Sequence, residues 1–460
     1  MPPSEPSDSL ALLSVADTSQ LPSVATDAVA VILRIPPEIT AKIFRHCLPD
    51  KPSPPAIDIA PLLLGRICKE WRRVAWGLPE LWSSLKIDKY VPLELVEAWL
   101  FRAGVTPLSI VIISDYSGEG WDITPYIAIL QRHAPRWRDI TFKRLACELM
   151  PQFFEAELHL PMLERLTIST IHEDDYSLGY CHAFRNARAL RHLDITSASL
   201  DVAGPITIPW AQLTSFECST FPLLPEHLLA ILYHTPNLVK CKVIIDYRGE
   251  SERLPDVPPL RFLTALGFSA FQSDADAMDV LLHLSLPALR SLDLSNIVSS
   301  GRKLVPHVQS FLYKQGCQLR ELAIRIRGDN PREEDFLQLL ETQPTLERFN
   351  LCEGSVDLHL AIFRRLHDDP SFLPRLVDLV GSPHLWPPEV ITTTFPVMLE
   401  TLADALAARW VAPQEFTQIR TCALSWSVNG SLTDLDKVIA EFRPRHEELM
   451  ALGISIYVGR

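Results

Sequence analysis

The stretch "LPALRSLDLSNI", residues 286–297, decides the fold of this 460-residue chain. Leu289, Leu292 and Leu294 follow the pattern apolar-x-x-apolar-x-apolar. Side chains of an extended chain alternate between two faces, so Leu292 and Leu294 share one face and Asp293 lies on the other. The stretch therefore predicts a short strand that buries one face and leaves the other polar.

The same pattern recurs along most of the chain, at intervals of roughly 22–43 residues. A sustained period of this length is the sequence signature of a repeat architecture. Clear copies begin at Trp82, Val105, Trp137, Leu163, Leu190, Leu213, Leu238, Leu260, Leu289, Leu319 and Leu346, and weaker copies at Leu376, Ile419 and Leu449.

Between the copies lie helical patterns, for which residues 225–234, 274–284, 305–314, 333–341 and 399–410 are examples. One strand with one helix cannot enclose a core, whereas stacked neighbours can. The sequence therefore predicts an α/β fold, a curved solenoid with a parallel sheet. Residues 82–460 resemble irregular leucine-rich repeats, with about 14 strand units and a C-terminal cap near 449–460. They are irregular because no Asn or Cys recurs after each strand.

Two shorter apolar segments precede the repeats. "IPPEITAKIFRHCL", residues 35–48, begins with two prolines and continues with apolar residues at helical spacing. Residues 61–76, "PLLLGRICKEWRRVAW", predict a second helix with one continuous apolar stripe. Leu62 and Trp76 lie outside that stripe, so a single core does not account for them. A unit this small is marginal alone, and docks either on the rest of the chain or on another protein.

These segments, with the closing Pro79, Leu81 and Trp82, resemble the F-box family. The resemblance implies a three-helix F-box over residues 31–85, after a tail (1–30) that we expect to be disordered. It also implies binding to the small Skp adaptor and through it to a cullin ubiquitin ligase. The alternative is that residues such as Ile39, Ile43 and Trp71 pack only within this chain. The residues expected to bind the adaptor are Ile35, Pro36, Pro37, Ile39, Ile43, Phe44, Leu48, Leu62, Leu63, Leu64, Ile67 and Trp71.

Composition limits the partners. The formal charge of −13 and the pI of about 5.6 argue against nucleic acid or an anionic membrane as the main partner. No signal peptide or membrane span is expected. The nine cysteines are scattered without a C-x-x-C pair, which favours reduced thiols and a cytoplasmic or nuclear protein.

Motifs for catalysis are absent from the sequence. No nucleophile elbow, phosphate loop or dinucleotide fingerprint occurs, and the histidines do not pair at metal-ligand spacing. The acidic run "HEDDY", residues 172–176, is interpreted as a solvated loop. Cys218, Cys241 and Cys422 fall at core positions of the repeats, so we expect small buried hydrophobes there. We therefore expect a protein that is not an enzyme and carries no cofactor or metal.

Polar residues between the core positions of each strand are candidates for binding a protein client. The function expected from both segments is a substrate-recognition subunit of a Skp–cullin–F-box ubiquitin ligase. The alternative is an interaction scaffold that does not direct ubiquitination. The client-binding candidates are Arg165, His192, Asp194, Glu217, Lys240, Lys242, Asp293, Glu321, Arg348 and Asn350.

Overall fold

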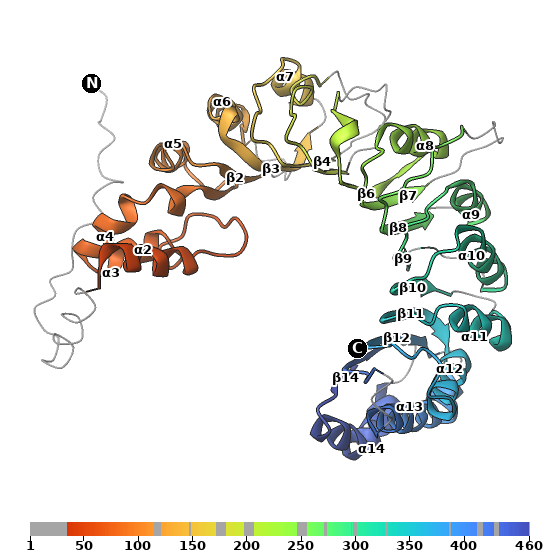
Figure 1. Cartoon of the computed structure of the whole chain (residues 1–460). Helices are drawn as coiled ribbons and strands as arrows, with labels where there is room; N and C mark the ends of the chain where they lie inside the picture. The colour runs from red at the N-terminus through yellow and green to blue at the C-terminus, as the bar shows by residue number, and fades with distance from the viewer. Residues whose placement is uncertain are drawn as a thin grey trace, which may run out of the picture. The chain divides into compact units, whose positions relative to one another are not determined.

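The computed structural model describes most of the chain after residue 34 (Figure 1). The predicted tail, 1–30, and the acidic run, 172–176, lie outside the described residues. These are 35–114, 121–146, 149–171, 181–196, 207–245, 255–270, 274–295, 297, 301–326, 330–385, 388–411, 417–426 and 432–459.

The chain forms two compact units. The first contains residues up to 86 together with 91–106, and the second contains residues 87–90 and 107–460. The sequence had suggested one segment over 31–85 and repeats from residue 82. Elements of the first unit are α2 (Pro37–His46), α3 (Leu62–Ile67), α4 (Lys69–Trp76), the 3-10 helix η2 (Pro79–Trp82) and α5 (Leu93–Arg102), and β1 (Ser84–Ile87) crosses the boundary.

An aromatic cluster forms the core of the first unit. The ring of Trp82 meets those of Trp76 and Trp99 edge to face at 5.1 and 4.8 Å between centroids. Trp82 Nε1 also donates a hydrogen bond of 2.9 Å to the carbonyl of Ala75. On the other side of the unit, Phe44 packs against Trp71 at 4.9 Å. These contacts join the helices through a few large side chains.

The second unit is an α/β solenoid with a parallel sheet. Neighbouring strands from β2 to β14 pair in chain order, and each described pair is parallel. The strands are β2 (Leu108–Ile113), β3 (Trp137–Ala146), β4 (Arg165–Ile171), β5 (His192–Thr196), β6 (Ser215–Leu223), β7 (Lys240–Ile245), β8 (Ala265–Ala270), β9 (Ser291–Leu294), β10 (Glu321–Arg325), β11 (Arg348–Ser355), β12 (Asp378–His384), β13 (Thr421–Ser425) and β14 (Ser455–Gly459).

Helices cover one face of this sheet and leave the other open (Figure 1). The five helical patterns named from the sequence are confirmed as α8, α9, α10, α11 and α13. The helices of this unit are α6 (Thr124–Arg132), α7 (Leu149–Phe154), α8 (Pro225–His234), α9 (Asp274–His283), α10 (Gly301–Gln315), α11 (Glu333–Glu341), α12 (Val356–Asp368), α13 (Thr394–Val411) and α14 (Leu432–Ala451), with 3-10 turns η3 (Ala134–Arg136), η4 (Trp210–Gln212) and η5 (Pro388–Ile391).

Alternation along the strands builds the core of the second unit. Leu292, Leu322 and Phe349 are in register on adjacent strands and are each 1% exposed. Cys241 and Cys422 occupy equivalent core positions, which confirms their predicted burial. Burial raises the pKa of both thiols to about 12, because a thiolate would lack solvation there.

Two predicted strand copies were misplaced. The motif that begins at Leu260 places its strand three residues too early. The strand is β8, and its core residues are Leu266 and Phe268. The copy read from Leu449 falls at the end of α14, and the last strand is β14 instead. At the first place leucines recur every three residues (260, 263 and 266), so the motif fits at more than one start. At the second, the apolar residues that match the motif belong to the end of α14 and the turn after it.

One helical stretch, Glu389–Val411, is long and apolar enough to span a membrane, with a mean hydropathy of 1.3. It contains α13, which packs against α12 and α14. Phe395, Met398 and Leu402 on this helix are fully buried. Packing inside the solenoid therefore accounts for its apolar character.

Candidate functional site

The first candidate surface consists of apolar side chains on α2. Pro36 caps the helix with an extended backbone and Pro37 occupies its first turn, so the two prolines set where it begins. Phe44 points into the unit and is 0% exposed, whereas Ile39 and Ile43 are 45% and 42% exposed. Isoleucines on one side of a short helix thus remain in contact with solvent.

The second helix differs from the prediction. A single helix over 61–76 is wrong, because the backbone of Cys68 is extended at φ −156° and ψ 171° and separates α3 from α4. Cys68 instead caps α4, since its Sγ accepts a hydrogen bond of 3.4 Å from the amide of Trp71.

The break changes which residues of the predicted stripe are buried. Leu64 lies in the core, whereas Leu63 and Ile67 on α3 are 41% and 54% exposed. We call Ile39, Ile43, Leu63 and Ile67 the exposed apolar set. The remaining adaptor-binding candidates are buried (Phe44 and Leu64), half-buried (Ile35, Leu48, Leu62 and Trp71) or exposed (Pro36 and Pro37).

Trp76 is explained within the first unit, although the sequence placed it outside the core. Its ring lies over Gly65, where a Cβ atom would come within 2.0 Å of Trp76 Cζ3. The guanidinium of Arg102 lies 5.8 Å from the centroid of the same ring. Trp76 therefore serves the internal packing of the first unit.

The second candidate surface is the open face of the solenoid. The structure places all ten client-binding candidates on this face in two rows, because they occupy the alternate, non-core positions of β4 to β11. The first row contains Arg165, His192, Lys240, Glu321 and Arg348, and the second contains Asp194, Glu217, Lys242, Asp293 and Asn350.

Charges on the β4–β7 part of the open face are closely coupled. Lys242 Nζ lies 3.8 Å from Glu217 Oε1. The pKa of Asp194 is raised to about 6, first because the carboxyl is partly buried and then because Glu217 stands beside it. The pKa of His192 is lowered by burial and by Arg165, which favours the neutral imidazole. This part of the face therefore changes charge in mildly acidic solution.

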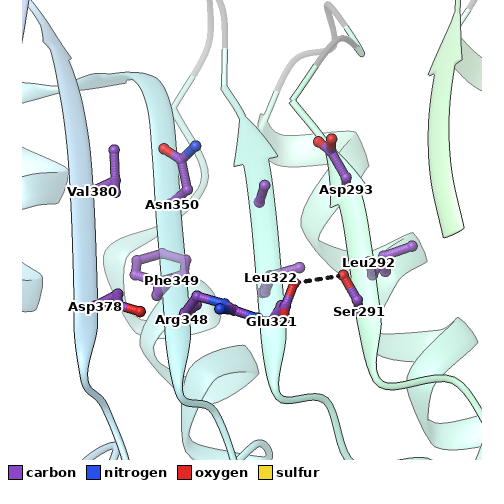
Figure 2. A pocket seen from close by; sticks show the side chains of 11 residues that line it. Ser291, Leu292, Asp293, Glu321, Leu322, Arg348, Phe349, Asn350, Asp378 and Val380 are labelled. Carbon is purple, nitrogen blue, oxygen red and sulfur yellow. Dashed lines mark hydrogen bonds and ion pairs between the residues drawn. The ribbon is translucent and has the colours of Figure 1, made fainter. Parts of the chain in front are cut away.

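A shallow depression of about 260 Å³ lies on β9, β10, β11 and β12 (Figure 2). Along one side, Arg348 forms an ion pair with Glu321, whose other oxygen accepts a 3.0 Å hydrogen bond from Ser291 Oγ. Asp378 accepts a hydrogen bond from Thr421 Oγ1. The polar groups of this row are thus held in place by neighbouring strands, a rigidity suited to recognition.

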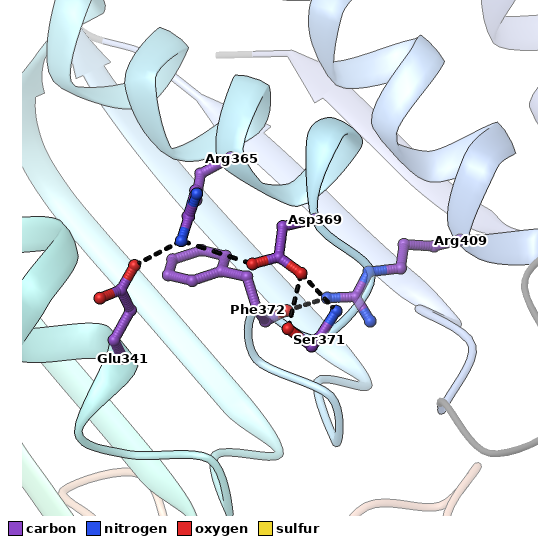
Figure 3. A network of polar contacts seen from close by, with 6 residues as sticks. All are labelled: Glu341, Arg365, Asp369, Ser371, Phe372 and Arg409. Atoms are coloured by element: carbon purple, nitrogen blue, oxygen red, sulfur yellow. Dashed lines mark hydrogen bonds and ion pairs between the residues drawn. The ribbon is translucent and has the colours of Figure 1, made fainter.

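A second polar network joins α11, α12, α13 and the loop between α12 and β12 (Figure 3). Arg365 Nη2 lies 2.9 Å from Glu341 Oε1 and 3.4 Å from Asp369 Oδ2. Arg409, only 1% exposed, donates to the carbonyl of Phe372. These contacts hold the loop between α12 and β12 against α12 and α13. Arg409 was missed by the sequence reading, because an arginine inside an apolar helix gives no signal of its partner.

Among the described residues, no group of three or more His, Cys, Asp or Glu is placed to hold a metal ion. No protein-family model matches the chain, and no curated protein is significantly similar to it. The exposed apolar set of the first unit and the open face of the second unit are the two candidate binding surfaces.

Proposed function

We propose that this protein is a substrate-recognition subunit of a Skp–cullin–F-box ubiquitin ligase. The first unit binds the Skp adaptor, and the open face of the second unit holds a protein client. The chain itself is not catalytic: it raises the local concentration of the client near activated ubiquitin, which another subunit supplies. Such an assembly would act in the cytoplasm or nucleus.

The exposed apolar set is the observation that carries this proposal. Ile39, Ile43, Leu63 and Ile67 keep between 41% and 54% of their surface in contact with solvent. Covering these parts of the side chains would contribute about 4 kcal/mol to binding, at roughly 2 kcal/mol for each fully buried aliphatic side chain. They lie on the helices that carry the F-box resemblance, so a bound adaptor gives them a partner.

The three short helices also support the proposal. The sequence resemblance implies three helices in this segment, and α2, α3 and α4 occupy it. The open face supports the client-binding part of the proposal, because a polar sheet face with ordered charge pairs suits specific recognition of a protein.

Co-purification from cells tests the proposal. Ile39→Asp with Ile43→Asp should abolish capture of the adaptor and the cullin, because two carboxylates would be buried without partners. The matched control is Phe101→Asp with Val105→Asp, two residues of the same unit that are 84% and 89% exposed. It should leave capture unchanged.

Three outcomes would argue against the proposal. Equal loss of capture in both double variants would show that added charge alone is responsible. A large fall in the thermal midpoint of the first variant would mean that Ile39 and Ile43 serve the protein's own core. Capture of the adaptor without the cullin would favour the non-degradative scaffold.

A further inference from the structure

We infer that the depression on β9–β12 receives an arginine or lysine side chain from an extended segment of a protein partner, which lies over Ala323 and pairs with Asp293. The inference rests on the proposed function in one respect, because it takes the open face as the surface that binds a partner. It adds the chemistry of the group that is recognised.

Asp293 carries a carboxylate oxygen that is free to bind a cation. Both hydrogen bonds to its side chain, from the amide and hydroxyl of Ser295 at 2.9 and 2.5 Å, go to Oδ1. Oδ2 has no partner within the described part of the chain. In the same row, Lys242 pairs with Glu217 on the side away from Asp293. The Asp293 carboxylate is therefore ordered by its neighbours but not neutralised by them.

The small side chain of Ala323 leaves room beside the Asp293 carboxylate. Ala323 on β10 is in register with Asp293 on β9 and with Asn350 on β11. Figure 2 shows Asp293 and Asn350 on either side of β10. Adjacent strands are about 4.8 Å apart, so the backbones of Asp293 and Asn350 are separated by roughly 10 Å across Ala323. A methyl group fills little of that gap and offers no hydrogen bond. An inserted side chain can thus lie on Ala323 and reach the oxygen of Asp293.

The charge around the depression favours a cation. The carboxylates of Asp378 and Glu321 line it, and only one guanidinium, that of Arg348, faces them. Two residues beyond Ala323 on β10, Arg325 lies 4.0 Å from Glu353, so these two charges balance one another. With Asp293 included, carboxylates outnumber guanidinium groups by two in this set.

The shape of the site favours a side chain delivered by a protein. The depression is shallow and open, and its polar groups lie in rows across parallel strands. A guanidinium is planar and can form two parallel hydrogen bonds with a carboxylate, and a lysine can form one. Each would gain more here than a neutral side chain, because no cationic group of the described residues pairs with the Asp293 carboxylate.

The test uses the purified chain and a library of random dodecapeptides displayed on phage. Peptides selected on the wild-type chain should be enriched in arginine or lysine at one position. That enrichment should disappear with Asp293→Asn, which removes the charge, and with Ala323→Leu, which fills the gap. Fluorescence anisotropy of a selected peptide should show a roughly tenfold loss of affinity in each variant, about 1.4 kcal/mol.

Two control variants make the result specific. Asp279→Asn changes the same charge at an exposed site on α9, and Ala423→Leu adds the same bulk on β13. Both should retain the selection and bind within twofold of the wild type. Thermal unfolding of all four variants checks that they are folded.

The inference is overturned if no peptides are selected, if acidic or neutral residues are enriched, or if Asp293→Asn still selects basic residues. An equal loss with Asp279→Asn would overturn it too, because net charge would then explain the binding. These outcomes are independent of adaptor capture, since the assay contains neither adaptor nor cullin. Failure of one proposal can therefore be told from failure of the other.

Discussion

The imidazole of His359 lies beneath the sheet, only 1% exposed, where two glycines leave room for it. Cβ atoms at Gly354 and Gly381 would approach the ring to 3.1 and 3.2 Å. Nδ1 donates to the carbonyl of Ser355 at 2.8 Å, whereas Nε2 has no hydrogen-bond partner among the residues that the structure describes. Burial accordingly lowers the pKa of His359 to about 4, and the ring is neutral at physiological pH.

This burial predicts a pH-dependent contribution to stability. Unfolding returns the pKa of His359 from about 4 to 6.5, so between these pH values the unfolded state binds more protons. The free energy of unfolding should therefore be highest above pH 6.5, as far as His359 is concerned. It should fall by about 3 kcal/mol as the pH is lowered to 4. Asp194, whose pKa is raised to about 6, contributes with the opposite sign.

The histidine can be isolated by comparing urea unfolding of the wild type and His359→Gln from pH 4 to 7. The difference between their free energies of unfolding should shrink as the pH falls, since glutamine does not titrate. A difference that is constant over this range would contradict the expected burial of a neutral ring.

Gly65 supports a second prediction for a single residue. Gly65→Ala should lower the free energy of unfolding by about 1–2 kcal/mol, because the new methyl group overlaps the Trp76 ring. Helix propensity alone would favour alanine. Gly77→Ala is the control: its Cβ would meet only backbone oxygens, the nearer at 3.2 Å, and should change stability by less than about 0.5 kcal/mol. Chemical denaturation measures both, and a more stable Gly65→Ala protein would refute the steric argument.

At the scale of elements, the break between α3 and α4 sets the character of the first unit. A continuous helix would have kept Leu63 and Ile67 in line with Leu64 and Trp71. The extended Cys68 turns the chain between them, so the apolar residues divide between core and solvent. Hydrophobic periodicity detects helices but is insensitive to one extended residue, and so it predicted a single helix.

The cap at this break can be tested with two substitutions. Cys68→Ser should keep or slightly raise the free energy of unfolding, because a hydroxyl accepts the amide hydrogen of Trp71 better than a thiol does. Cys68→Ala should lower it by about 0.5–1 kcal/mol, since that amide then loses its partner. Equal stability losses in both variants, measured by thermal unfolding, would argue against capping by Cys68.

At the scale of the whole molecule, the second unit gains its stability from successive neighbours. Each strand pairs with the next in the chain, and the core row passes through every strand. In such an array the loss of one core side chain is felt mainly by adjacent repeats.

Leu322→Ala in β10 tests this organisation. Removing a buried leucine costs about 2–5 kcal/mol locally. Hydrogen exchange should therefore quicken in β9, β10 and β11 while β4 and β5 retain their protection. Uniform acceleration across the sheet would instead show that the solenoid opens as one cooperative unit.

Sequence periodicity was sufficient to predict the parallel α/β solenoid and to identify the residues that face its open side. A strand has a period of two, so a motif that fixes its core positions also fixes the positions between them. Periodicity also located α8 and α11 to the residue. It misplaced β8, where leucines three residues apart offered alternative starts, and β14, where apolar residues at the end of α14 match the same motif.

Only the tertiary structure decided which apolar residues of the first unit stay exposed and which polar residues of the second are matched. Trp76 packs against Gly65 and Trp82, whereas the side chains of Ile39 and Ile67 remain about half exposed. Arg348 met Glu321 across a strand pair, and Asp293 met no cation within the described residues. Burial and charge pairing depend on contacts between residues far apart in the chain. A local sequence pattern does not say which of these distant residues come into contact.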